Sequence, residues 1–144
     1  MAETKNRFEQ ISHTADLGLH VYGSTLPELF ENAALGMFSL ISDAAGIQEK
    51  LLISVSIDAY DTEELLITFL NELLYYYSTK RVLLKRFEIT GLTATHLDAS
   101  VSGEELTERS GYEVLHDVKS ATYHDLKIVR TAAGAYETRV IFDV

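Results

Sequence analysis

Residues 61–77, DTEELLITFLNELLYYY, carry the strongest structural signal in the sequence. Asp61 is a favourable helix N-cap residue, and Glu63 and Glu64 place negative charge where the helix dipole is positive. Apolar side chains then recur at three- and four-residue steps: Leu65, Leu66, Phe69, Leu70, Leu73, Leu74 and Tyr77. The pattern predicts an amphipathic helix with one buried face. Asn71 and Glu72 interrupt the apolar run, which is also too short to cross a membrane.

A second helix is predicted to begin at Thr25. Thr25 and Glu28 have the spacing of a capping box, and Pro27 falls in the first turn, where its missing N–H costs little. The apolar positions that follow are Leu29, Phe30, Ala33, Ala34, Met37, Phe38 and Ile41. The sequence therefore predicts two helices that each bury one face.

The other segments have the composition and turn residues of β-strands. We expect a strand from Phe8, a turn at His13–Gly18 and a strand over Leu19–Tyr22. The further strands and turns that we predict are Leu51–Ile57, Val82–Thr90, a turn at Gly91, Leu92–Val101, a loop over Gly103–Gly111, and β-rich stretches at Val114–Ala121, Leu126–Arg130 and Tyr136–Val144. The expected fold class is α+β, with two amphipathic helices packed on one face of a mixed, largely antiparallel β-sheet in a single domain, 1–144.

Composition and charge exclude several classes of protein. The 144 residues include 12 Lys and Arg against 22 Asp and Glu, so the formal net charge is −10. A protein that grips nucleic acid directly normally carries a basic stripe, and the densest basic cluster, at 80–86, is short and bracketed by apolar residues. We therefore expect any contact with RNA to be indirect. An acidic protein of this size more naturally meets a metal ion or a basic protein partner.

Several catalytic and targeting motifs are missing from the sequence. It contains no cysteine, which excludes disulfides, thiol nucleophiles and cysteine-held zinc or iron–sulfur sites. Its five histidines match no tight zinc spacing, and there is no G-x-S-x-G, P-loop or G-x-G-x-x-G motif. The missing motifs lead us to expect no catalytic residues. No secretory signal or membrane-spanning segment is visible, so we expect a cytoplasmic protein with no membrane association.

Carboxylates near the two ends of the sequence are the best candidates for a binding site. Asp16 lies in the polar stretch after the first predicted strand, and Asp143 ends an apolar run one residue before Val144 and its α-carboxylate. If the last strand finishes beside the 13–18 turn, these three groups form an all-oxygen site suited to Ca²⁺ or Mg²⁺. Two simpler readings stay open from the residues alone. Asp16 can bond its own backbone in a turn, and the chain end can simply be solvated.

Lys119 belongs to a polar insertion, Lys119–His124, in a predicted strand. A lysine at this position can contact a phosphate or the carboxylate of a partner, although solvent is the default environment for such a side chain.

Five segments, taken in order, resemble the archease family: HTADLGL at 13–19, LPELFENAALGMF at 26–38, EELLITFLNELLYYY at 63–77, VKSATYHDLKI at 118–128 and RVIFDV at 139–144. The similarity runs from about Phe8 to Val144, and the HTAD turn together with the terminal FDV is its specific part. Ser120 stands where family members often have alanine, and the loop Gly103–His116 is hard to align.

The resemblance implies a non-catalytic activator of the 3′-phosphate RNA ligase that joins tRNA exons during tRNA splicing. Such an activator promotes guanylylation of the ligase by GTP and permits multiple turnover. The resemblance also implies a divalent cation, Ca²⁺ or else Mg²⁺ or Mn²⁺, held by Asp16 and Asp143 and completed by Val144. Lys119 is then the residue that acts at the active site of the ligase. The ligase is the expected partner, and the protein is expected to contact RNA only through it.

Two alternatives from other classes are open. One is a chaperone-like binder of RNA-modifying enzymes, which exposed tyrosines on the helix at 61–77 would support. The other is a metal-dependent hydrolase that uses the Asp16 and Asp143 site to activate water.

Overall fold

The computed structural model describes residues 7–13, 16–43, 46–107 and 112–144. Its elements are β1 Phe8–His13, β2 Asp16–Gly23, α1 Leu26–Ile41, β3 Leu51–Asp58, α2 Thr62–Lys80, β4 Val82–Leu92, β5 His96–Glu105, β6 Ser120–Thr122, β7 Val129–Arg130 and β8 Tyr136–Asp143. The predicted α+β class is confirmed, with two helices packed on antiparallel strands. None of the helices in these ranges is long and apolar enough to cross a membrane.

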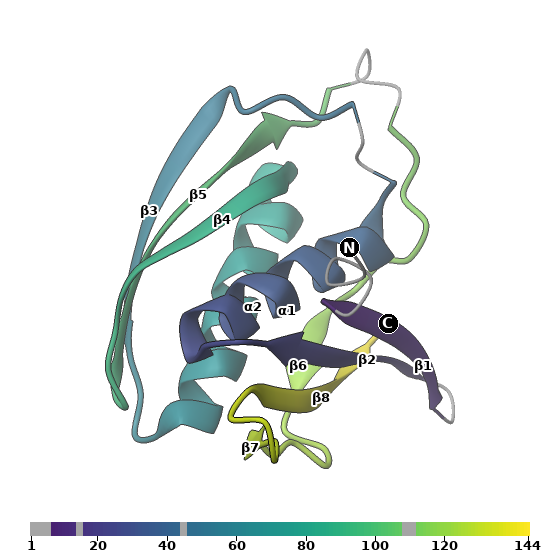
Figure 1. Cartoon of the computed structure of the whole chain (residues 1–144). Coiled ribbons are helices and arrows are strands. Elements are labelled where there is room, and N and C mark those ends of the chain that lie inside the picture. The colour runs from purple at the N-terminus through teal and green to yellow at the C-terminus, as the bar shows by residue number, and fades with distance from the viewer. Residues whose placement is uncertain (1–6, 14–15, 44–45, 108–111) are drawn as a thin grey trace.

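The strands form two sheets, not the one sheet that the sequence suggested. β1, β2, β8 and β6 follow one another in the first sheet, in which β7 also pairs with β8; the second sheet has the order β3-β5-β4. Every strand pairing in the described residues is antiparallel, so neither sheet is mixed there as the sequence suggested. Figure 1 shows the helices between the sheets, and α1 contacts both β2 and β4. The sequence could not reveal this split, because each strand pattern shows only that one of its faces is buried.

The position of α1 between two sheets explains its composition. All seven predicted core residues of this helix are buried, and Asn32, Gly36 and Leu40 are buried as well. At Gly36, an added Cβ would lie 2.8 Å from Leu19 Cδ1 and 2.9 Å from Phe8 Cγ, so the glycine lets α1 approach the first sheet closely. The helix begins as predicted, with the Thr25 hydroxyl accepting a hydrogen bond from the Glu28 N–H at 3.2 Å.

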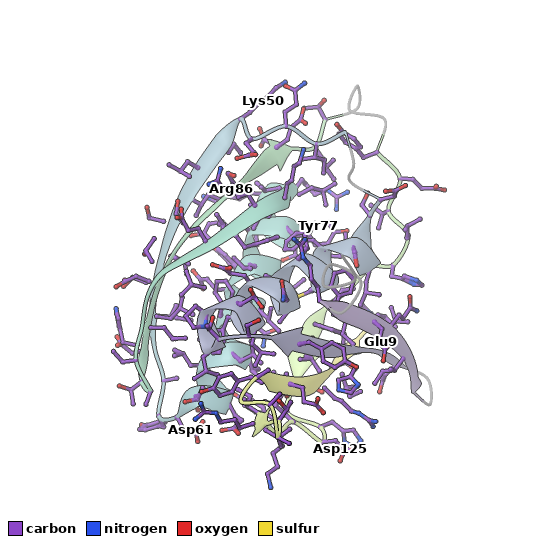
Figure 2. All side chains as sticks on the ribbon, viewed as in Figure 1. Glu9, Lys50, Asp61, Tyr77, Arg86 and Asp125 are labelled. Atoms are coloured by element: carbon purple, nitrogen blue, oxygen red, sulfur yellow. The ribbon has the colours of Figure 1, made fainter. Side chains whose placement is uncertain are left out.

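The second helix also begins where the sequence indicates. Asp61 caps α2 by accepting the Glu64 N–H at 2.8 Å, and the Glu64 carboxylate accepts the Tyr60 N–H at 2.6 Å. The helix ends at Arg81, which adopts a left-handed conformation with φ 56° although glycine is the usual residue there. Side chains of the apolar stripe are buried between the sheets, and Figure 2 shows Tyr77 well inside the molecule.

One predicted turn is too long and another is misplaced. The chain reverses between His13 and Asp16, within the predicted turn at 13–18, but Asp16 and Gly18 already belong to β2; Gly18 pairs with Ile11 of β1 and Ile141 of β8. A Cβ on Gly18 would lie 2.8 Å from Ile11 Cγ1, so this glycine makes room for a neighbouring strand. Gly91 likewise lies within β4 at an irregularity of the register, and the reversal to β5 comes after Leu92.

Strand boundaries in the last third of the chain also differ from the prediction. Strand β5 extends to Glu105, so the predicted loop Gly103–Gly111 begins later, and its residues 108–111 lie outside the described part. Only Ser120 and Ala121 of the predicted stretch Val114–Ala121 lie in a strand, β6, apart from an isolated bridge between Ser42 and Val114. This segment instead follows the C-terminal end of α1, where Leu115 N–H donates to Ile41 O at 2.7 Å.

Candidate metal centre at one end of the five-stranded sheet

Strand register places the two candidate aspartates opposite each other. Strands β2 and β8 pair with Leu17 facing Phe142 and Gly18 facing Ile141. The same register continued by one residue sets Asp16, the first residue of β2, against Asp143, the last residue of β8. Directly opposed residues lie on the same face of an antiparallel pair, with Cβ atoms about 4.5–5.5 Å apart. The sheet therefore brings together two carboxylates that are 127 positions apart (143 − 16) in the sequence.

Asp16 and Asp143 belong to a row of paired residues that continues across the neighbouring strands of the sheet. Asp16 also pairs with His13 of β1, and Asp143 pairs with Ser120 of β6. Thr14 and Ala15, the middle of the HTAD turn, and the side chain of His13 lie outside the described part of the structure. Sequence analysis did not place Ser120 in the site, because nothing in a three-residue strand indicates which neighbour it pairs with.

Lys119 is linked to the candidate site by a backbone hydrogen bond. Its N–H donates to the Asp143 carbonyl oxygen at 2.8 Å, which fixes this residue beside the end of β8. The Lys119 side chain is exposed, and no described residue forms an ion pair or hydrogen bond with it. Lys119 therefore lies beside Asp143 at the end of β8, with its side chain exposed.

The strand that carries Lys119 and Ser120 is held by a side chain of α2. Asn71 Oδ1 accepts the Ala121 N–H at 2.8 Å, and Asn71 Nδ2 donates to the Ala121 carbonyl at 3.2 Å. One amide side chain thereby satisfies both outward-facing backbone groups of Ala121 on the edge strand β6. In the sequence, Asn71 appeared only as a polar interruption of an apolar run, and its role depends on a contact across fifty residues.

A buried phenol lies close to the same segment. Tyr77 is 2 % exposed, and its hydroxyl oxygen has no hydrogen-bond partner among the described residues. Burial raises the pKa of Tyr77, and the negative charge of Asp117, two residues before Lys119, raises it further. The tyrosine therefore stays neutral, and the Arg81 guanidinium lies 5.5 Å from its ring centroid.

The chemistry of the donor set fits a hard divalent cation. Asp16 is half-buried, whereas Asp143 and Val144 are exposed, with Val144 at 44 %. Two unit charges about 5 Å apart repel by about 1 kcal/mol in water and by more where water is excluded. The third predicted donor is the α-carboxylate of Val144. Among the side chains that the structure describes, no group of three or more His, Asp or Glu is arranged to hold a metal.

Comparisons with known proteins agree with this architecture. The model of the Archease protein family (MTH1598/TM1083) matches residues 8–144. A protein archease of Methanosarcina barkeri is 31 % identical over 147 residues and covers 100 % of both chains. A protein archease of Sulfurisphaera tokodaii is 36 % identical and covers 85 % of this chain and 88 % of its own.

Two solved structures share the fold. The solution structure of Methanobacterium thermoautotrophicum protein 1598 has a TM-score of 0.82 at 35 % identity, covering 96 % of this chain and 99 % of its own. The crystal structure of a Thermotoga maritima archease, described as a possible chaperone, has a TM-score of 0.61 at 20 % identity and covers 94 % and 96 %. With the family model spanning nearly all of the sequence, the chain belongs to the archease family.

Proposed function

We propose that this protein is a non-catalytic, divalent-metal-binding activator of the 3′-phosphate RNA ligase that joins tRNA exons. It promotes guanylylation of the ligase by GTP and multiple turnover, and it meets RNA only through the ligase in the cytoplasm. The observation that supports this function best is the register that sets Asp16 against Asp143, with Lys119 bonded to the same strand end. Membership of the archease family points to the same function.

The residues of the site divide into two roles. Asp16, Asp143 and the Val144 carboxylate would hold the cation, which when bound supplies positive charge to a phosphate or carboxylate oxygen of the partner. Asn71 is a positioning residue, because it fixes the strand that Lys119 precedes. Lys119 offers a strongly hydrated ammonium group that can approach a phosphate at the ligase active site.

The surface charge suits the proposed partner. The net charge of −10 repels free RNA but favours association with a protein whose own RNA cleft is basic. The sequence offers no cysteine nucleophile and no phosphate-binding loop, which agrees with an activator whose partner carries out the chemistry.

Ligase turnover tests this proposal. Purified ligase is supplied with RNA and GTP, and the number of ligation events per ligase is measured with and without this protein. We expect Lys119→Ala to abolish activation while Lys127→Ala, a change of another exposed lysine, leaves it intact. Because surface substitutions usually change stability by no more than about 0.5 kcal/mol, both variants should melt alike. Full activation by folded Lys119→Ala would remove this residue from the mechanism.

A chaperone-like role is the second candidate, and exposed aromatic side chains favour it. Tyr60 is 90 % exposed, and Tyr75 and Tyr123 are more than half exposed. Suppression of the aggregation of unrelated proteins, unaffected by Asp143→Asn, would support this role over a dedicated activator. Release of product from a phosphodiester by the protein alone with Mn²⁺ or Mg²⁺ would instead indicate a hydrolase.

A further inference from the structure

A cavity of about 560 Å³ opens at the opposite end of the five-stranded sheet from the candidate metal centre. It lies between α1, the end of β2 and the turn that enters β8, so the whole length of β2 separates the two sites. The residues that give this cavity its chemistry are Arg7, Glu28, Glu31, Asn32 and Tyr136.

Three side chains of α1 line the cavity, and each is anchored by a hydrogen bond through one of its polar atoms. Glu28 Oε1 accepts the Ser24 N–H at 2.7 Å, and Glu31 Oε2 accepts the Ile89 N–H at 2.8 Å. Asn32 Nδ2 donates to the Tyr22 carbonyl at 2.7 Å. Residues three and four apart share a helix face, so the second carboxylate oxygens and the amide oxygen form one group of acceptors.

The amide oxygen of Asn32 is the acceptor that gives the strongest evidence for a bound hydrogen-bond donor. Asn32 is only 8 % exposed, yet no described residue donates a hydrogen bond to its Oδ1. In the described residues, the Tyr77 hydroxyl is the one fully enclosed polar side-chain atom without a partner, so Asn32 Oδ1 is not fully enclosed. Because Asn32 lines the cavity, its Oδ1 is accessible from there. A buried polar atom that opens only to a cavity marks the place of a hydrogen-bond donor.

A ligand that matches these acceptors in charge and hydrogen bonding is a planar cation with several N–H groups. Among the residues that line the cavity, two carboxylates, Glu28 and Glu31, outnumber one basic side chain, Arg7, which disfavours an anionic ligand. Tyr136 also lines the cavity, and the Arg130 guanidinium, which is outside the cavity lining, lies 5.4 Å from its ring centroid, so this ring can stack with a guanidinium. A guanidinium has five N–H donors in a fixed plane, whereas an ammonium group has three around a point charge.

We propose that this cavity binds the guanidinium group of an arginine side chain that a partner protein presents. The assignment does not depend on ligase activation, because arginine alone is enough to test it. The probe is N-acetyl-arginine methylamide, which carries no charge besides the guanidinium. Its neutral isostere is the corresponding citrulline compound, and the lysine compound is the third probe.

Amide chemical shifts in two-dimensional NMR report both the site and the affinity of each probe. We expect the arginine probe to shift resonances around Glu28, Glu31 and Asn32 with millimolar affinity, several-fold tighter than the lysine probe, and the citrulline probe to leave them unchanged. Equal binding of citrulline, or an arginine probe that shifts no resonance at this cavity, would overturn the proposal.

Variants test the charges one at a time. Glu28→Gln and Glu31→Gln keep an oxygen for the Ser24 and Ile89 N–H groups but remove a charge, and each should weaken arginine binding about two- to fivefold. Glu72→Gln removes the same charge from α2, outside the cavity, and should have no effect. Arg7→Ala should tighten binding. A loss of affinity in Arg7→Ala, or an equal loss in Glu72→Gln, would contradict a specific guanidinium site.

Discussion

Replacement of Asn71 by alanine tests how α2 holds the edge of the five-stranded sheet. The change removes the two hydrogen bonds to Ala121, each worth about 0.5–1.5 kcal/mol, so about 2 kcal/mol is lost in total. Ala121 is 5 % exposed, which prevents water from fully replacing the amide. Alanine has a higher helix propensity than asparagine by about 0.5 kcal/mol, so the expected net loss is about 1.5 kcal/mol.

Urea unfolding measures this loss, and thermal unfolding should show a decrease of about 5 °C in Tm for a chain of this size. Hydrogen exchange at the Ala121 amide should accelerate more than at Phe142 in the central strand β8. Ser78→Ala, an exposed change on the same helix, controls for helix propensity. The reasoning is refuted if Asn71→Ala costs less than about 0.5 kcal/mol or leaves exchange at Ala121 unchanged.

Three other measurements address the metal centre, the buried phenol and one surface histidine. Ca²⁺ or Mg²⁺ should raise Tm through binding linkage, and calorimetry should show weaker binding after Asp143→Asn or with a C-terminal tag but not with an N-terminal tag; equal affinities throughout would exclude the site. Tyr77→Phe should stabilise the fold by about 1 kcal/mol in urea unfolding, since it removes an unsatisfied buried hydroxyl, and a loss of stability would reveal a hidden partner. His96 donates to Asp58 and Asp98, and these hydrogen bonds raise its pKa, so its stabilising effect is full below about pH 6.5 and is lost as pH rises through the higher folded-state pKa. An NMR titration in which Asp58→Asn fails to lower the His96 pKa would contradict this assignment.

Local signals in the sequence predicted the helices well. Thr25 and Asp61 cap α1 and α2 as expected, because an N-cap acts on backbone groups only a few residues away. The failures concern contacts between distant segments. Gly18 and Gly91 resemble turn residues in isolation, but the first is small to admit Ile11 and the second lies at a strand irregularity.

The candidate site was predictable in part for the same reason. Asp16 and Asp143 were singled out as carboxylates at the ends of apolar segments, and the β2–β8 register places them opposite each other. Their role as metal ligands, with Val144, stays a prediction, as does the role of Lys119. Ser120 and Asn71 were missed, because their importance depends on which strand lies next to which helix, and no local pattern encodes that.

The order of the strands along the chain has a consequence for synthesis on the ribosome. The three strands of the second sheet lie together between residues 51 and 105, so that sheet can form while later residues are still being made. The first sheet cannot, because β8, the last strand, lies between β2 and β6 and also pairs with β7. Until β8 emerges, the edge of β2 that faces away from β1 has no strand beside it, and β6 and β7 have no strand to pair with. The nascent chain is therefore most exposed to aggregation at its earliest residues, and the row that contains Asp16 and Asp143 is among the last features to assemble.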